Sequence, residues 1–417
     1  MEVRKGYKLS EVGEIPVDWA VKEIGKEIDL ITGFPFKSNK YSSTGVRLLR
    51  GSNVKRGVTD WSEDITQYWE AITPELKPYI LAKGDIVIAM DGSLVGRSFA
   101  RLSSIDIPAL LLQRVARIRS TNIELGYLKE FICSDYFTKH CDASKTVTAI
   151  PHISPADIRK FKVPVPPTKS EQTAIATALS DADALITSLE KLIEKKRAIK
   201  QGAMQELLKP KEGWDVKKLG DLTKLFTKQT GFDYTAYIKP SLIQIKSDDT
   251  LPFIQNKDFK NKWVNLNTDY FIPKSIAIKF PQILLDEKSL LISISGSVGN
   301  VGVYDSKELA FIGGAVAILK FKEPKLIEWV MIYLISKEGQ NNLLGNVKAG
   351  SHQNLILEDI RKIEILLPNV DEQASIVNIL SDMDDEIVSL ELNLAKYKQI
   401  KQGMMQELLT GKIRLVK

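Results

Sequence analysis

Residues 171–211 read EQTAIATALSDADALITSLEKLIEKKRAIKQGAMQELLKPK, and residues 372–412 read EQASIVNILSDMDDEIVSLELNLAKYKQIKQGMMQELLTGK. Aligned without a gap at a constant offset of 201, the two stretches are identical at 22 of 41 positions. Identity at this level within one chain indicates an internal duplication, so the same period is expected elsewhere in the sequence.

Weaker matches upstream of each stretch extend the repeat. They pair residues 18–25 with 214–220, residues 84–93 with 289–297, and residues 157–160 (DIRK) with 359–362 (DIRK). The chain is therefore predicted to consist of two halves of about 200 residues, each a globular block followed by a long helix. The helices agree closely and the blocks only loosely, which indicates that the helices share one role while the blocks differ.

Each globular block combines short strands with one helical segment. Apolar runs of strand length alternate with Gly and Asp turns, and helical periodicity is confined to residues 123–139 in the first block and 327–340 in the second. This mixture predicts an α+β domain in each half. Two tandem α+β domains separated by two long helices, with pseudo-two-fold symmetry, is the predicted fold class.

The long helices carry apolar residues at a spacing of 4, 3, 4, 3 and 4 in both copies. This heptad seam predicts an antiparallel coiled coil between the two helices, a rod of roughly 45 Å at ~1.5 Å per residue. Ser170 and Asp371 are the expected helix caps, each following a proline. The seam comprises Ile175, Leu179, Ala182, Ile186, Leu189 and Ile193 in the first helix, and Ile376, Leu380, Met383, Ile387, Leu390 and Leu394 in the second.

The predicted domain boundaries follow from these patterns. They are 1–169 for the first domain, 170–211 for the first helix, 212–370 for the second domain, 371–411 for the second helix, and 412–417 for a tail.

Composition narrows the class of protein. The net charge is +6, and residues 1–170 hold most of the excess, with 25 Lys and Arg against 20 Asp and Glu. A local basic face on the first domain is compatible with nucleic-acid binding.

Because the sequence has neither a leader-like apolar region nor an apolar run of about 18 residues, we expect no membrane association and a cytoplasmic location. Cys133 and Cys141 are expected to be reduced thiols.

No catalytic or metal-binding pattern emerges from the sequence. The run from Gly92 to Ser98 lacks the spacing and the lysine of a phosphate-binding loop, and no methyltransferase motif is present. Gly296, Gly299 and Gly302 are interpreted as turns. The three histidines have no ligand spacing, and the acidic clusters at 181–183 and 382–386 are interpreted as a solvated or protein-docking face of the helices. We therefore expect no catalytic residue, no metal and no cofactor in this chain.

The positive indications are for binding. Several polar, basic loops carry the side chains that contact phosphates and base edges in DNA complexes. The candidate DNA-binding residues are Lys37, Lys40, Arg50, Asn53, Lys55, Arg56, Lys145 and His152 in the first block, and Lys257, Lys260, Lys262, Lys348, His352 and Gln353 in the second.

The sequence resembles the specificity subunits of type I restriction-modification systems. The resemblance rests on the order of block and helix, on GEIPVDW at 13–19, on prolines followed by EQ and LSD, and on IKQGMMQELLTGKIRL at 400–415. It implies that each domain is a target recognition domain reading one half of a split site in double-stranded DNA. It also implies that the helices set the gap between half-sites and dock modification subunits, two of them, with restriction subunits joining through the complex.

The resemblance places catalysis in the partners. Adenine methylation with S-adenosylmethionine, and translocation and cleavage with ATP and Mg, would belong to the other subunits. One feature departs from the family pattern: residues 209–214 are shorter than the opening 6–19 that they should mirror, so something else is expected to cover the end of the first helix.

Three alternatives remain at this stage. The chain could serve a fused restriction-methylation enzyme of another type, or be a coiled-coil scaffold whose end domains bind proteins or sugars. An autonomous nuclease or methyltransferase is disfavoured by the missing motifs.

Overall fold

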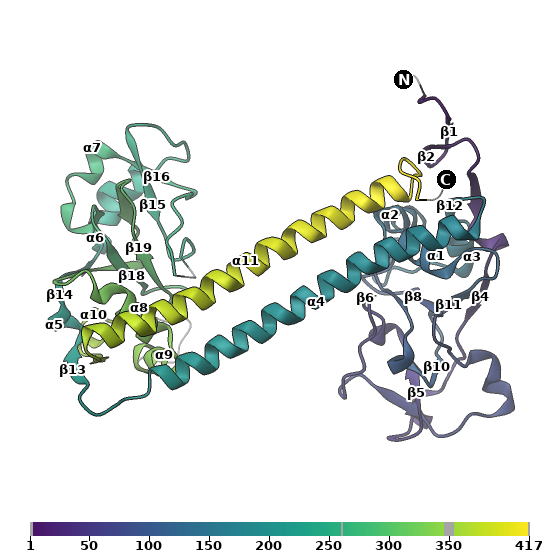
Figure 1. The fold of residues 1–417 in the computed structure, drawn as a ribbon, viewed down its shortest axis with the longest axis horizontal. Coiled ribbons are helices and arrows are strands. Elements are labelled where there is room, and N and C mark those ends of the chain that lie inside the picture. The colour runs from purple at the N-terminus through teal and green to yellow at the C-terminus, as the bar shows by residue number, and fades with distance from the viewer. Residues whose placement is uncertain (1–2, 260–261, 346–353, 416–417) are drawn as a thin grey trace. The chain divides into compact units, whose positions relative to one another are not determined.

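The computed structural model describes residues 3–259, 262–345 and 354–415. The chain divides into two compact units, one formed by Met1–Lys191 with Leu392–Lys417 and the other by Leu192–Glu391. Each unit holds one α+β domain together with part of each long helix, α4 (Lys169–Leu207) and α11 (Val370–Leu408), as Figure 1 shows. The predicted α+β class is confirmed in both halves.

The first unit contains the following elements. Its strands are β1 (Tyr7–Ser10), β2 (Gly13–Pro16), β3 (Ala20–Glu23), β4 (Asp29–Thr32), β5 (Val46–Leu49), β6 (Arg56–Gly57), β7 (Gln67–Trp69), β8 (Ile86–Ala89), β9 (Phe99–Arg101), β10 (Ala109–Leu111), β11 (Val115–Arg119) and β12 (Lys162–Val165). Its α-helices, besides the long ones, are α1 (Leu125–Ile132), α2 (Asp135–Ser144) and α3 (Pro155–Arg159).

A five-stranded sheet in the order β4-β11-β8-β9-β6 forms the centre of the first domain. Because side chains alternate across a strand, Ile86 and Ile88 of β8 join one core with α1, α2 and the long helices. Val87 and Ala89 pack on the other face, against residues of the second sheet, β10-β5-β7. Burial on both faces explains why β8 reads IVIA without a polar residue.

The second unit repeats the plan with different details. Its strands are β13 (Asp215–Lys218), β14 (Thr223–Lys228), β15 (Thr250–Ile254), β16 (Phe271–Pro273), β17 (Leu284–Leu285), β18 (Ser289–Ser293), β19 (Val301–Tyr304), β20 (Ala310–Ile312), β21 (Val316–Phe321) and β22 (Glu364–Leu367). Its shorter α-helices are α5 (Leu219–Leu222), α6 (Gly231–Asp233), α7 (Lys274–Ala277), α8 (Leu326–Ile335), α9 (Lys337–Leu344) and α10 (Leu357–Arg361).

The sheet β14-β21-β18-β19 takes the central place in the second domain. Leu290 and Ile292 of β18 face α8 and the long helices, while Leu291 faces the sheet β16-β15-β20-β17. The registers also correspond: Val115 lies opposite Ala89 in the first domain, and Val316 lies opposite Ser293 in the second. The two domains are therefore copies of one fold.

The repeated DIRK motif has the same role in both copies. The Arg159 guanidinium donates to the carbonyl of Leu30 on β4 (2.9 Å), and Arg361 donates to the carbonyl of Phe226 on β14. A Cβ placed on Gly25 would lie 2.6 Å from the Cβ of Arg159, so only glycine fits beside this arginine. In each domain this arginine therefore hydrogen-bonds the short helix that precedes the long helix to the first strand of the central sheet.

Both long helices begin one residue earlier than expected. The Thr168 hydroxyl accepts from the amide of Glu171 (3.2 Å), and the Asn369 side chain accepts from the amide of Glu372 (2.9 Å). The caps are therefore Thr168 and Asn369, and the predictions of Ser170 and Asp371 were wrong. In both copies the helix starts as soon as the chain leaves a proline, and the single residue between proline and helix supplies the capping oxygen.

Ion pairs show how the two helices run within each unit. In the first unit, Asp183 pairs with Lys401, and Glu190 pairs with Lys398 (2.7 Å). In the second unit, Lys196 pairs with Glu386 (2.6 Å) and Lys200 with Asp384. Partner numbers on α11 fall as numbers on α4 rise, so the helices are antiparallel in each unit.

The predicted seam is shielded from solvent. Its members are buried or half-buried along both helices, with Ile193 4% and Ile387 8% exposed. Ile175 and Leu179 join the core of the first domain, and Ile376 and Leu380 join that of the second. The interlocking side-chain packing of a coiled coil stays a prediction. None of the helices in the described ranges is long and apolar enough to cross a membrane.

Candidate nucleic-acid interface

Loops that are far apart in the sequence meet at one edge of the central sheet of the first domain. β8 ends there at Ala89, shortly before Asp91, β11 starts there after Arg114, and β9 and β6 begin at the same edge. The amide of Met90 donates to the carbonyl of Arg114 (2.9 Å), and the amide of Phe99 donates to that of Lys55 (3.1 Å). We call this group of loops, residues 50–56, 91–98, 113–114 and 145–152, the first-domain edge.

The centre of the first-domain edge is an ion pair. The Arg114 guanidinium donates to the carboxylate of Asp91 (2.9 Å), and its side chain is 65% exposed. Arg114 has φ = 67°, a left-handed conformation that is uncommon for residues other than glycine. The backbone therefore holds a solvent-facing arginine at this edge. Sequence reasoning missed it because a positive φ at a non-glycine residue leaves no pattern in the sequence.

Two of the predicted basic loops reach this centre. Asp91 and His152 form an isolated strand-like bridge, and the amide of Gly92 donates to the carbonyl of Pro151 (3.0 Å). On the other side, a Cβ built on Gly51 would lie 3.6 Å from the Asp91 carboxylate. The structure thus brings the 50–56 and 145–152 loops together around one acidic side chain.

The 50–56 loop keeps its shape through Asn53. This side chain is fully buried, accepts from the amide of Arg50 (3.1 Å) and donates to the carbonyl of Asp60 (2.9 Å). With both ends of the carboxamide occupied, Asn53 holds the loop from inside the domain, and its predicted contact with DNA stays a prediction. Arg56 is exposed, and Lys55 is half-exposed with a weak ion pair to Asp60 (3.7 Å).

The remaining first-domain candidates have other surroundings. Lys145 pairs with Asp142 (2.6 Å), which also accepts from Arg97 (2.9 Å), so these two cations of the first-domain edge share one carboxylate. Lys37 and Lys40 are exposed on a short helical turn, and the contacts that join the loops to Asp91 do not involve them. The DNA contacts of all these residues stay predictions.

The second domain has a cavity at the equivalent edge. Ser295 and Asn354 form the bridge that corresponds to Asp91 and His152, and Ala315 takes the position of Arg114 before the following strand. Without the arginine and the aspartate, the place of their ion pair is occupied by a cavity of about 1000 Å³. We call it the second-domain cavity; its polar lining includes Lys228, Gln229, Thr230, Gln255, Asn256, Ser295, Asn354, Glu358 and Arg361.

Of the second-domain candidates that the structure describes, neither Lys257 nor Lys262 lines this cavity. Lys257 pairs with Asp269, and the Lys262 ammonium donates to the hydroxyl of Ser381 on α11 (2.7 Å). Lys260, Lys348, His352 and Gln353 lie outside the described residues. The amide-rich side of the cavity was missed because its residues come from segments far apart in the sequence, near 229, 255 and 354, and only the fold brings them together.

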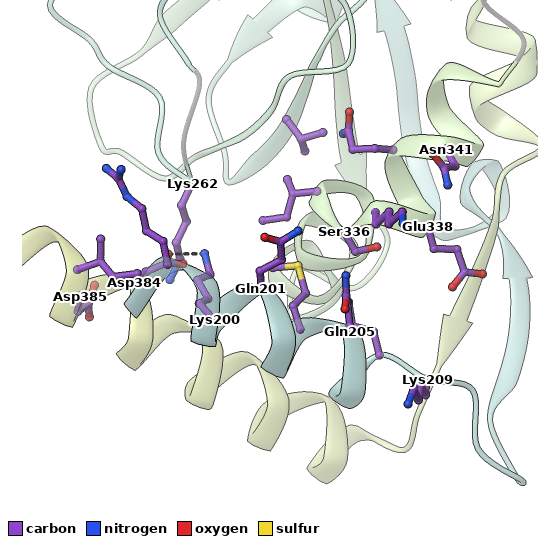
Figure 2. A pocket seen from close by; sticks show the side chains of 18 of the residues that line it. Lys200, Gln201, Gln205, Lys209, Lys262, Ser336, Glu338, Asn341, Asp384 and Asp385 are labelled. Carbon is purple, nitrogen blue, oxygen red and sulfur yellow. Dashed lines mark hydrogen bonds and ion pairs between the residues drawn. The ribbon is translucent and has the colours of Figure 1, made fainter. Parts of the chain in front are cut away.

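A second hollow in the same unit lies against the long helices. Figure 2 shows Lys200, Gln201 and Gln205 of α4 along this groove, with Ser336 and Glu338 at the start of α9. The groove measures about 1250 Å³ and also borders Lys209 and Pro210, just after the first helix. In the first unit the corresponding helix end is covered, since the Tyr7 hydroxyl donates to the carbonyl of Gly411 (3.0 Å) and Pro16 packs beside that glycine. The shortened segment at 209–214 thus coincides with a groove.

The acidic clusters on the long helices form ion pairs between α4 and α11, and they are not solely a solvated face. Asp183 accepts from Lys401 and from Lys129 (3.0 Å), and Glu130, 1% exposed, also binds Lys129 (2.8 Å). Burial by itself would raise the pKa of Asp183, but the hydrogen bond from Lys401 and the charge of Lys129 outweigh it, so the pKa lies below its ordinary value of 3.8. Asp384 occupies the corresponding place in the second unit with Lys200.

The duplicated α+β domain, with a long helix after each copy, defines a two-domain chain built from one repeated structural unit. The family model of the type I restriction modification DNA specificity domain matches the chain twice, over residues 16–201 and 211–402. The chain belongs to this family, the specificity subunits of type I restriction-modification systems.

Relatives extend over almost the whole chain. A protein of Methanocaldococcus jannaschii, provisionally named as the specificity subunit of the type I restriction enzyme MjaX, is 27% identical, and the alignment covers 99% of this chain and 97% of that protein. The EcoBI specificity subunit of Escherichia coli is 24% identical over 95% of this chain and 86% of its own length. The crystal structure of a type I S subunit from M. genitalium has the same fold, with a TM-score of 0.59 at 17% identity, covering 96% of this chain and 97% of that one.

Proposed function

We propose that this chain reads a bipartite site in double-stranded DNA, one half with each domain, and carries no catalytic centre of its own. The observation that supports this most directly is the pair of equivalent sheet edges. The same topological position holds the Arg114 and Asp91 pair in one domain and an open cavity in the other. Different side chains at one position of a duplicated fold are suited to reading different half-sites.

Phosphate contacts would supply much of the affinity. Exposed cations at the first-domain edge, among them Arg56 and Arg114, suit contacts to the DNA backbone, while the polar loops between them suit base edges. Affinity should therefore fall steeply as salt rises, because each neutralised phosphate releases condensed counterions. A fixed gap between the half-sites, set by the long helices, stays a prediction from the sequence.

Docking of modification subunits is the second part of the proposal. Each unit exposes large apolar side chains on its segments of the long helices, which monomeric surfaces rarely gather in quantity. In the first unit these are Leu185, Leu392, Tyr397 and Ile400, and in the second they are Leu192, Ile199, Ile379 and Val388. One such set in each unit fits two modification subunits, one per unit. Restriction subunits would join through them, and S-adenosylmethionine, ATP and Mg would be bound by these partners.

Binding selection tests the proposal. The chain would be co-purified with a type I modification subunit, and DNA retained from a random pool would be sequenced at several salt concentrations. The expected result is a motif in two parts separated by unread positions, with retention that falls as salt rises. A single contiguous motif, or no enrichment by a complex that has assembled, would contradict it.

A further inference from the structure

Phe232 is an aromatic side chain that the second domain leaves in solvent. It stands in α6, four residues after β14 ends, and is 72% exposed, more than any other phenylalanine, tyrosine or tryptophan in the described ranges. The Thr230 hydroxyl accepts from the amide of Asp233 (3.1 Å), and the Thr235 hydroxyl donates to the carbonyl of Gly231 (2.9 Å). The ring is thus held at the surface by a turn with hydrogen bonds of its own.

A row of aromatic rings supports Phe232 from the core outward. Its ring meets that of Tyr237 edge to face, with the centroids 6.1 Å apart, and Tyr237 is itself 53% exposed. Tyr237 lies against Phe280 (6.3 Å), which lies against the buried Phe311 (6.5 Å). Contiguous apolar side chains at a surface, unlike solitary ones, indicate a binding site.

The two exposed rings adjoin the sheet edge that we propose contacts DNA. β14 ends at this edge with Lys228, which is exposed, lines the second-domain cavity and makes no ion pair with a described residue. Gly231 and Tyr234, close to Phe232 in the sequence, line the same cavity. Lys239, just after the aromatic turn, is also exposed and without an ion pair among the described residues. Exposed rings next to such cations suit DNA, because its phosphates attract the lysines while its bases offer surface to the rings.

A phenylalanine ring suits one feature of the base edges in particular. Its side chain has no hydrogen-bond donor or acceptor, and the apolar group that a base edge presents in the major groove is the C5 methyl of thymine. Covering a hydrogen-bonding group with the ring would remove its water contacts without replacing them, whereas burial of the methyl is favourable.

We propose that Phe232 is a specificity-determining residue that packs on the methyl group of one thymine in the half-site read by the second domain. This inference rests on the proposed function, since it names one base contact made by that domain. Lys228 would contact a phosphate beside this base pair and so position the ring.

Exchange of thymine for uracil tests the contact directly, because it removes the methyl and keeps every hydrogen-bonding group of the base pair. The parent chain, assembled with the modification subunit, would first select its motif from a random pool. Each thymine of that motif would then be replaced in turn by uracil, and affinity would be measured by fluorescence anisotropy. Uracil at one thymine of one half-site should weaken binding by the parent about fourfold, the value of one buried methyl group, and Phe232→Ala should bind the two duplexes equally.

Leu309→Ala is the matched control. Leu309 is an exposed apolar residue before β20, a strand whose other end leads into the turn at Gly313 that lines the cavity. This variant should discriminate thymine from uracil as the parent does. Because Phe232 is largely exposed, Phe232→Ala should also unfold at the temperature of the parent, so that a lost preference reports the contact and not the fold.

Two results would overturn the inference. In one, the parent binds every uracil duplex as tightly as the thymine duplex. In the other, Phe232→Ala keeps the parent's preference at every thymine, even if its affinity falls, as it would for a ring inserted between base steps. If the parent complex itself selected no bipartite motif, the proposed function would fail first, and this inference with it.

Discussion

Arg414 donates two hydrogen bonds to the buried carboxylate of Glu171, one of them with an Nη2 to Oε2 distance of 2.7 Å. The segment after the second helix thereby closes over the start of the first. The second unit repeats the relationship, because Lys211, after the first helix, binds Glu372 at the start of the second (2.6 Å). The EQ motif of the repeat thus marks the place where each helix receives the end of its antiparallel neighbour.

Replacing Arg414 with alanine should destabilise the first unit. Glu171 is fully buried, so the variant leaves an unpaired carboxylate. The expected loss is about 2–3 kcal/mol, below the ~3–5 kcal/mol of a fully buried pair because Arg414 itself is partly exposed. Hydrogen exchange at residues 171–191 would report it. Lys211→Ala, which breaks the equivalent pair in the second unit, is the matched control. It should cost less stability there, since the Lys211 side chain is 54% exposed. Equal protection in Arg414→Ala and the parent would show that the pair does not hold the helix.

The pair of Asp183 and Lys401 should make helix pairing sensitive to acid. The pKa of Asp183 is lower in the folded chain than in the unfolded one, so its contribution is present above about pH 4 and is lost as the pH falls through the folded pKa. Asp183→Asn should cost roughly 1 kcal/mol near pH 7, and the gap between variant and parent should close below pH 4.

Unfolding of both proteins between pH 7 and pH 3 checks this expectation. Asp181→Asn, at an exposed position on the same helix, serves as the control and should follow the parent throughout. A gap that stays constant with pH would mean that the charge of Asp183 does not contribute to pairing.

Residues of the heptad seam should contribute more to stability than the helix residues beside them. Ile193 is 4% exposed, whereas its neighbour Leu192 is 38% exposed. Ile193→Ala should lose about 2–3 kcal/mol in the second unit, and Leu192→Ala less than about 1 kcal/mol. Chemical denaturation would measure both. Similar losses for the two variants would place the helix contact on another face than the heptad pattern predicts.

Arg114 should contribute to DNA affinity on one side of the site. Arg114→Gly removes the guanidinium and suits the left-handed backbone at this position, so the fold should be retained. If Arg114 contacts a phosphate, the slope of log affinity against log salt should become shallower by about 0.9. Fluorescence anisotropy with the selected site would measure the slope. Lys40→Gly, at an exposed lysine away from Asp91, tests whether any lost cation has this effect. An unchanged slope in Arg114→Gly would exclude a phosphate contact.

The exposed apolar residues on the helices predict the stoichiometry of the complex. Leu392 and Ile400 are 68% and 43% exposed and belong to the first unit. Replacing both with serine should reduce the bound modification subunits from two to one, because only one docking surface is changed. Native mass spectrometry would count them. Retention of two subunits would show that docking uses other residues.

Periodicity made the helices, the duplication and the α+β class predictable, because each depends on patterns that recur along the sequence. Each helix cap was missed by two residues, since Thr168, Ser170 and other neighbours all have suitable oxygens and only the backbone decides which one is used. The site was harder to predict. Arg114 depends on an unusual φ, the burial of Asn53 has no signature in the sequence, and Gln229 is distinguished only by the hydrogen bonds that it lacks among the described residues.

Methylome sequencing tests the central claim most directly. A host without other type I systems would express this chain with a type I modification subunit, and a strain expressing the modification subunit alone would serve as the control. The predicted result is a new motif in two parts, with N6-methyladenine on both strands and a constant number of unread base pairs between the halves. Methylation of a contiguous motif, or no new motif from a complex shown to assemble, would contradict the account.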